Sequence, residues 1–151
     1  MTGIIFSSKY IEWRTPQKFF DRLNEEFHFV LDAAATYRNT KCKLYYSIYP
    51  DALTQSWNHG GAVFCNPPYG RNIGKWVQKA YEESQSGVTI VMLLPARTDT
   101  QWFHNWVYGK AEIRFIKGRI KFEDEEGKKL WNAPFPSMIV IYDSNMEQKD
   151  G

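Results

Sequence analysis

Ala62-Val63-Phe64-Cys65-Asn66-Pro67-Pro68-Tyr69-Gly70 is the stretch of this chain that decides its fold. The first four residues are apolar and predict a short buried strand. The segment from Ile73 to Ser84 follows with apolar side chains at helical spacing, which predicts an amphipathic helix. A strand that enters a helix through a tight turn is the first half of a βαβ unit, so the stretch predicts an α/β fold.

The flanking sequence supplies the other elements of that fold. Val88 to Leu94 is a continuous apolar run, typical of a strand that is buried on both faces of a parallel sheet. A helix is predicted from Trp13 to Phe27, with Thr15 as its N-cap and Pro16 in its first turn. We also expect a helix at Thr98 to Tyr108 and strands at Phe27 to Ala33, Lys43 to Ile48, Ala111 to Phe115, Ile120 to Phe122 and Met138 to Tyr142.

Alternating strands and helices predict a mostly parallel sheet, closed by an antiparallel pair of strands at the C-terminal end. Ligands bind at the carboxyl ends of the strands in such sheets. Asp32, Asn66 and Pro95 each follow or end a predicted strand. We therefore expect these three residues to mark one site.

Length and composition fit one soluble domain. The chain has 151 residues and a hydrophobic fraction of 43%, which favours a globular core over disorder. We expect one domain over residues 1–151, with a loosely attached arm at 1–10 and a flexible tail at 143–151. The sequence shows no signal peptide and no apolar run that could span a bilayer, so we expect a cytoplasmic protein without a membrane partner. Cys42, Cys65 and the three histidines lack metal-ligand spacing, so we expect no metal.

The turn Asn66-Pro67-Pro68-Tyr69 has the properties of a site for a planar amine. Two consecutive prolines stiffen the turn and remove two backbone donors, so its carbonyl groups have no internal partner. The Asn66 side chain adds an acceptor oxygen, and an amine with two hydrogens fits between two acceptors. Tyr69 can stack on a base. We expect Asn66, Pro67, Pro68 and Tyr69 to be catalytic.

Several segments of the chain together resemble the phage-type DNA N-6-adenine methyltransferase (phage Dam) family. The resemblance covers most of the sequence from Trp13 to Tyr142, in order. The matching segments are 13–16, 31–34, 39–42, 51–53 with Trp57, 66–69, 93–100 with 102–103, and 118–122.

The resemblance implies a Rossmann-like methyltransferase fold, S-adenosyl-L-methionine as methyl donor and adenine in double-stranded DNA as acceptor. It places cofactor contacts at Thr15, Pro16, Asp32, Ala33, Ala34, Asp51 and Leu53. One departure is the loop Ala33-Ala34-Ala35-Thr36, which stands where such loops usually carry glycines. Alanine disfavours positive φ angles, so we expect the loop to adopt a different backbone geometry.

Basic residues after the predicted strand ends are candidates for phosphate contacts. We expect nucleic-acid contacts from Arg71, Lys75, Arg97, Arg119 and Lys121, within a basic run that also includes Arg114 and Lys117. An adenine-specific DNA methyltransferase is the expected activity, in a monomer or homodimer and, if phage-encoded, in the cytoplasm of a bacterial host. The alternatives are methylation of RNA adenine or of protein glutamine, and a nucleic-acid binder without catalysis.

Overall fold

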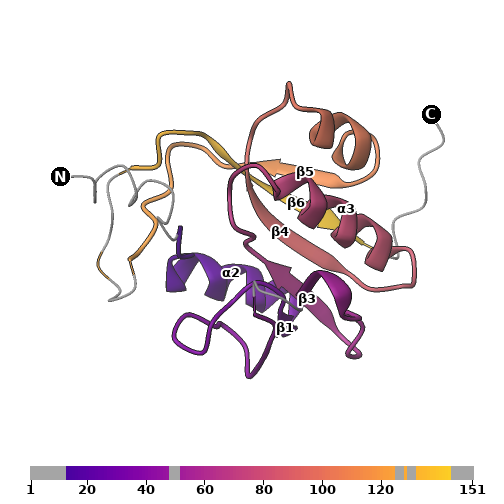
Figure 1. The fold of residues 1–151 in the computed structure, drawn as a ribbon. Coiled ribbons are helices and arrows are strands. Elements are labelled where there is room, and N and C mark those ends of the chain that lie inside the picture. Colours follow the sequence, from indigo (N-terminus) through magenta and orange to yellow (C-terminus); the bar gives the residue numbers. More distant parts are fainter. Residues whose placement is uncertain (1–12, 48–51, 125–127, 129–131, 144–151) are drawn as a thin grey trace.

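The computed structural model describes residues 13–47, 52–124, 128 and 132–143, and within them the chain forms one six-stranded mixed sheet (Figure 1). The expected arm at 1–10 and most of the expected tail lie outside these residues. In chain order the elements are α2 (Gln17–Phe27), β1 (Phe29–Asp32), β2 (Leu44–Tyr45), the 3-10 helix η1 (Ala52–Thr54), β3 (Ala62–Cys65), α3 (Ile73–Ser84), β4 (Ile90–Pro95), the π-helix η2 (Phe103–Val107), β5 (Glu112–Phe115) and β6 (Ser137–Tyr142).

The strand order β2-β1-β3-β4-β6-β5 confirms a mixed α/β architecture. β1 is parallel to β2 and β3, and β3 is parallel to β4. β6 is antiparallel to both β4 and β5, so β6 alone of these strands runs against the rest. An antiparallel pair is present at the C-terminal end, but β6 pairs there with β5 and not with the strand predicted at Ile120 to Phe122.

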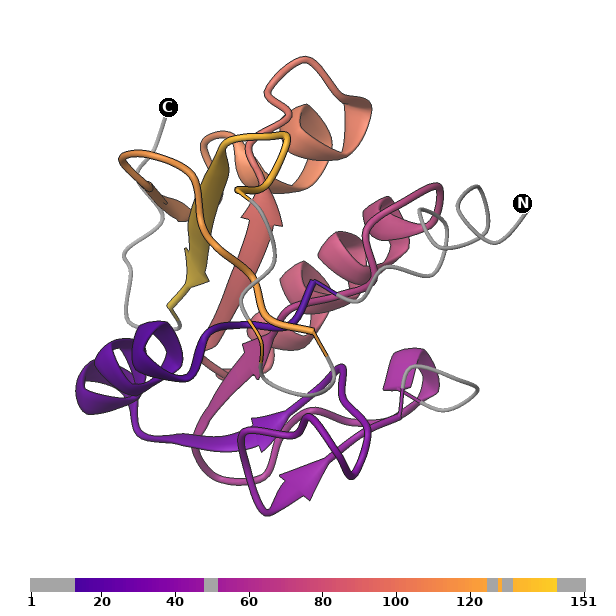
Figure 2. The same ribbon diagram turned by 90° about the vertical axis from the view of Figure 1, so that its left-hand side faces the viewer.

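Helices cover both faces of the sheet, which explains why its central strands are apolar on every residue. α3 packs on one face, where Val77 and Trp76 join β-strand side chains such as Met92 in a buried cluster. α2 packs on the other face, where Phe20 joins Phe64 in a second cluster. Figure 2 shows α2 and α3 on opposite sides of the sheet.

The first helix is shorter than the sequence predicts. It begins at Gln17, and Thr15 makes no side-chain cap, so the prediction of a helix from Trp13 with Thr15 as N-cap is wrong. The preceding residues are instead extended: Arg14 forms an antiparallel bridge with Glu123, whose N–H donates to the Arg14 carbonyl at 2.9 Å. A tertiary partner 109 residues away thus decides the conformation of this segment.

Two further predictions differ from the structure: one strand is absent, and one helix begins later than expected. Ile120 to Phe122 is not a strand, although Ile120 and Phe122 are buried and Lys121 is exposed, as alternation predicts. Within the part of the chain that the structure describes, the segment makes one backbone bond, from Ala133 N–H to the Ile120 carbonyl, and no ladder.

The helix expected from Thr98 starts only at Gln101 and widens into η2. Within η2 the Tyr108 N–H reaches back five residues to the Phe103 carbonyl at 2.8 Å, the bond that defines a π turn.

Phe122 provides a test of this packing, because it is fully buried although it lies outside any strand. Its ring contacts Trp13, Tyr69 and Phe135, with centroids 5.5–6.3 Å away. We expect Phe122→Ala to lower the free energy of unfolding by about 3–5 kcal/mol in urea titrations. Phe115→Ala is the matched control, since Phe115 is 63% exposed and its loss should change stability by less than about 0.5 kcal/mol. Equal effects of the two substitutions would contradict this packing.

Candidate active site

The strand order reverses direction between β1 and β3, which marks the place where a ligand is expected. From β1 the chain forms β2 on one side and then β3 on the other side. In open α/β sheets this arrangement leaves a crevice outside the carboxyl ends of the two central strands. Asp32 is the last residue of β1, and Asn66 follows directly after β3. The topology therefore brings together the two residues that the sequence analysis placed in one site, and Pro95 ends the adjacent β4.

The side-chain amide of Asn66 is held by the segment before α2. Its Nδ2 donates to the backbone carbonyl of Trp13 at 2.5 Å and to the hydroxyl oxygen of Thr15 at 3.1 Å. A carbonyl oxygen can only accept, so the bond to Trp13 fixes which end of the amide is nitrogen. Both amide hydrogens are consequently used within the protein.

The remaining atom of that amide, Asn66 Oδ1, is buried and has no hydrogen-bond partner among the described residues. An unpartnered buried acceptor costs about 1–3 kcal/mol, which makes such an atom a feature that requires an explanation. A ligand with an N–H or O–H donor would satisfy it, whereas an acceptor would not. The geometry thus selects donors at this position.

The rest of the turn is rigid. Pro67 is buried and Pro68 is partly buried. The Tyr69 hydroxyl donates to the Leu93 carbonyl of β4 at 3.0 Å, and burial raises its pKa well above the usual value. The Tyr69 ring lies edge-on to Phe122 and Phe135 and remains partly exposed. Tyr69 is therefore anchored at its hydroxyl end and keeps ring surface for contact.

Trp13 and its aromatic neighbours are part of the site that sequence reasoning did not identify. The Trp13 ring packs edge-on against Phe122 at 5.5 Å and Phe135 at 5.3 Å, and this packing holds the carbonyl that orients Asn66. The one available signal was the flanking of Phe135 by Pro134 and Pro136, which is typical of a fixed turn. The packing of Trp13 on Phe135 itself joins residues more than 50 positions apart, so no local pattern in the sequence indicates it.

Asp32 is buried, with 3% of its surface exposed, and its carboxylate organises the following loop. It accepts the Lys41 N–H at 3.0 Å and the Ala34 N–H at 3.4 Å. Burial raises its pKa from the usual 3.8 to about 6, partly offset by these two backbone bonds. A buried carboxylate at a strand end is a candidate acceptor for a ligand. The same carboxylate also holds the backbone of the following loop through the Lys41 and Ala34 N–H groups.

The other residues expected to contact a cofactor lie in three separate segments of the chain. Ala33 N–H donates to the Phe64 carbonyl of β3 and Ala35 N–H donates to the Tyr46 carbonyl after β2, so these backbone donors are already engaged by neighbouring segments. Pro16 precedes α2, and its carbonyl accepts the Phe20 N–H at 3.1 Å. Leu53 lies in η1 and packs partly against the α3 side of the core. Asp51 lies outside the described residues.

All five residues expected to contact nucleic acid are exposed and lie on segments that leave the carboxyl edge of the sheet. These segments follow β3, β4 and β5, and the residues are Arg71, Lys75, Arg97, Arg119 and Lys121. Because β5 runs in the same direction as β4, its following segment belongs to the same edge. The Arg97 guanidinium also lies over the Phe135 ring, 5.8 Å from its centroid.

Arg114, which stands in the same basic run of the sequence but was not among the expected contacts, forms ion pairs within the protein. Its guanidinium makes two bonds of 2.7 Å to Glu26 and one of 2.6 Å to Glu112. The hydrogen bonds that Arg114 donates to Glu26, and then to Glu112, raise its pKa. Arg114 therefore joins β5 to α2 and has its charge neutralised there.

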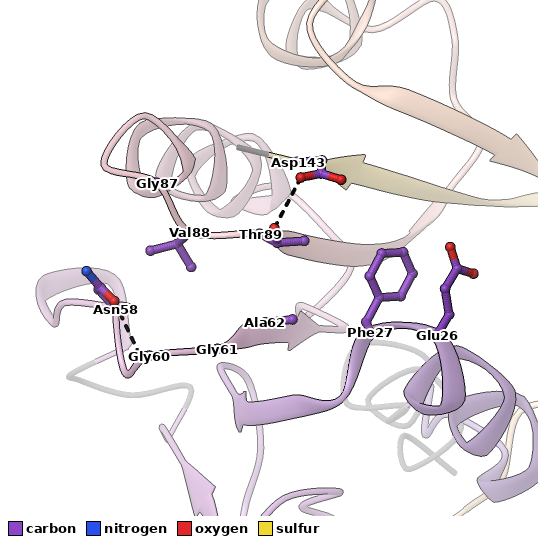
Figure 3. Close-up of a pocket in the computed structure, with 10 residues that line it drawn as sticks. All are labelled: Glu26, Phe27, Asn58, Gly60, Gly61, Ala62, Gly87, Val88, Thr89 and Asp143. Atoms are coloured by element: carbon purple, nitrogen blue, oxygen red, sulfur yellow. Dashed lines mark hydrogen bonds between the residues drawn. The ribbon is translucent and has the colours of Figure 1, made fainter. Parts of the chain in front are cut away.

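A pocket of about 630 Å³ opens at the opposite edge of the sheet, near the amino ends of β3 and β4 (Figure 3). Glycines and the acidic side chains of Glu26 and Asp143 contribute to its walls. Asn66 and Asp32 lie at the carboxyl edge and are not part of it. This pocket is therefore separate from the candidate active site.

The raised pKa of Asp32 makes stability depend on pH in a defined direction. Because the folded-state value is above 3.8, the contribution of Asp32 to stability is fully present below pH 3.8 and is lost as pH rises to about 6. The loss amounts to about 3 kcal/mol. We expect Asp32→Asn to remove this loss, so that wild type declines relative to the variant between pH 4 and 7 in urea titrations. Asp99→Asn, at an exposed carboxylate, is the control; parallel pH profiles for wild type and Asp32→Asn would refute the assignment.

Comparisons with known proteins identify the family of this chain. Residues 7–150 match the family described as DNA N-6-adenine-methyltransferase (Dam). A DNA N-6-adenine-methyltransferase of Escherichia phage T1 is 35% identical over 116 residues, which cover 76% of this chain and 48% of the relative. The chain thus spans about half the length of the curated relative that it matches. Since the family match extends over nearly the whole sequence, the chain belongs to the DNA N-6-adenine-methyltransferase (Dam) family.

Proposed function

We propose that this chain transfers a methyl group from S-adenosyl-L-methionine to the exocyclic amine of adenine in DNA. The observation that carries the proposal is the amide of Asn66: both of its hydrogens are bound internally, and its buried Oδ1 is left as an acceptor. The amine of adenine is a donor with two hydrogens. Family membership, and the name of the phage relative, support adenine and DNA as the acceptor.

The residues of the turn would act by position and by dipole. S-adenosyl-L-methionine, when bound, supplies the methyl group as an electrophile. Asn66 Oδ1 would accept one hydrogen of the adenine amine and the Pro67 carbonyl the other, which holds the nitrogen lone pair toward the methyl group. As positive charge develops on that nitrogen, both oxygens stabilise it without reorganisation. The proton then leaves to water, and no dedicated base or metal enters this scheme.

Tyr69 would provide the stacking surface for the base. Its hydroxyl is tied to Leu93, so the ring is oriented before the base arrives. Stacking on an aromatic side chain contributes about 1–3 kcal/mol per base. That energy offsets part of the few kcal/mol needed to rotate adenine out of a duplex.

The cofactor fits the chemistry of the carboxyl edge between β1 and β3. Its ammonium group and ribose hydroxyls are donors and require acceptors, which a carboxylate such as Asp32 or the carbonyl oxygens of the following loop can provide. The N–H groups of Ala33, Ala34 and Ala35 are engaged within the protein, so this loop would bind through oxygen atoms. We propose that Pro16, Asp51 and Leu53 complete the surroundings, within a single domain of the Rossmann-like methyltransferase fold. Thr15, which the resemblance also assigned to the cofactor, has its hydroxyl bonded to Asn66 instead.

The proposed partner is double-stranded DNA. The five exposed basic residues lie on segments that leave the same edge of the sheet as Asn66 and would contact phosphates. Among the described residues no helix is long and apolar enough to cross a membrane. We retain the expectation of a monomer or homodimer in the cytoplasm.

A methyl-transfer assay with isotopically labelled S-adenosyl-L-methionine tests the proposed function. We expect nucleoside mass spectrometry to find N6-methyladenine when duplex DNA is the substrate, and no label in RNA or in a glutamine-containing protein. Asn66→Ala should lower the rate by about 10²–10³, as for the loss of one preorganised group at a reacting centre. Asn58→Ala, an exposed asparagine at the opposite edge, is the matched control and should retain full activity.

If the label appears only in RNA or only in protein, DNA is not the substrate and the proposed function is wrong. Cofactor and DNA binding without transfer to any substrate would identify a catalytically silent binder. Wild-type activity in Asn66→Ala would remove Asn66 from the mechanism.

The basic residues are tested by the salt dependence of DNA binding. Each phosphate contact contributes about 0.9 to the slope of log K against log salt concentration. We expect Arg71→Gln and Lys75→Gln each to reduce the magnitude of that slope by about 0.9 in fluorescence titrations. Arg22→Gln removes the same charge from the exposed surface of α2 and should leave the slope unchanged. If all three variants keep the salt-dependence slope of wild type, DNA does not contact Arg71 or Lys75 at the carboxyl edge.

A further inference from the structure

We infer that Thr15 is a positioning residue that fixes the amide of Asn66 in its acceptor orientation, an inference that rests on the proposed function. The resemblance to the Dam family assigned Thr15 to cofactor contact. The structure instead places its hydroxyl oxygen 3.1 Å from Asn66 Nδ2. Thr15 is 3% exposed, so this hydroxyl is withdrawn from solvent and faces a defined partner.

The orientation of the Asn66 amide follows from its two hydrogen-bond donors. Asn66 Nδ2 carries two hydrogens, and the Trp13 carbonyl at 2.5 Å takes one of them. The Thr15 hydroxyl oxygen takes the second. With both donors satisfied, Oδ1 is the only polar atom of the side chain that is free for a substrate. Without the Thr15 hydroxyl, one amide hydrogen would lose its partner, and the amide could rotate to place nitrogen at the substrate.

The segment that carries Thr15 is itself fixed from both sides. Trp13 packs against the rings of Phe122 and Phe135, and Arg14 bridges to Glu123. The Pro16 carbonyl then accepts the Phe20 N–H at the start of α2. The position of the hydroxyl is therefore set by the fold and not by the site that it serves, as a positioning role requires.

Thr15→Val tests the inference, because valine keeps the volume and shape of threonine and removes only the hydroxyl. Loss of one hydrogen bond in a reacting geometry should lower kcat about ten-fold. We expect KM for DNA and the cofactor Kd from calorimetry to remain unchanged, since the bond acts on Asn66 and not on either ligand. Thr15→Ser restores the hydroxyl and should return kcat to within about two- to three-fold of wild type. Thr89→Val, at the amino edge, is the control.

An activity-independent measurement separates this inference from the proposed function. In ¹⁵N-labelled protein the side-chain amide signals of Asn66, assigned by their loss in Asn66→Ala, should shift in Thr15→Val and stay near wild type in Thr15→Ser. That shift is expected even if the wild-type chain methylates no DNA. Thr15→Ala with the same readout serves if Thr15→Val does not fold.

Two results would overturn the inference. One is an unchanged Asn66 amide signal and an unchanged kcat in Thr15→Val. The other is a weakened cofactor Kd in Thr15→Val with kcat intact, which would make Thr15 a cofactor ligand.

Discussion

The hydrogen bond from Asn66 Nδ2 to the Trp13 carbonyl connects the three parts of this molecule on which the site depends. It joins the turn after β3 to the segment before α2, and the Trp13 ring joins that segment to Phe122 and Phe135. An asparagine amide has chemically different ends, so this one bond also decides whether the substrate meets nitrogen or oxygen. The sheet places the site at its carboxyl edge. The orientation of this single amide then decides whether the site binds a donor or an acceptor group of a ligand.

The same constraint explains why the aromatic residues gather on one side of the site. A turn with two prolines lacks two backbone donors, so fewer bonds within its own backbone can hold it and it gains from support outside. Tyr69 supplies one support through the Leu93 carbonyl, and the cluster around Phe122 supplies the other. The Arg97 guanidinium covers the cluster where it meets solvent. Stability and chemistry therefore share residues here, and core substitutions such as those at Phe122 bear on both.

Much of the fold followed from local pattern, because β3 and α3 are decided by short-range periodicity and match their predicted bounds. The turn from Asn66 to Tyr69, which is proposed to be catalytic, was likewise visible as a local motif. The failures share a cause: Trp13 to Thr15 are extended, and Ile120 to Phe122 lack a ladder, because each segment is shaped by contacts with the other region of the chain. The partners of the Asn66 amide were hidden for the same reason, since no spacing relates Thr15 to Asn66.

A crystal structure of the chain with S-adenosylhomocysteine and a short adenine-containing duplex is the most direct test of the account. The account predicts a rotated-out adenine with its amine nitrogen about 2.7–3.2 Å from Asn66 Oδ1, while Nδ2 still faces the Trp13 carbonyl and the Thr15 hydroxyl. An adenine amine bound away from Asn66, or an Asn66 amide with its nitrogen turned to the base, would contradict it.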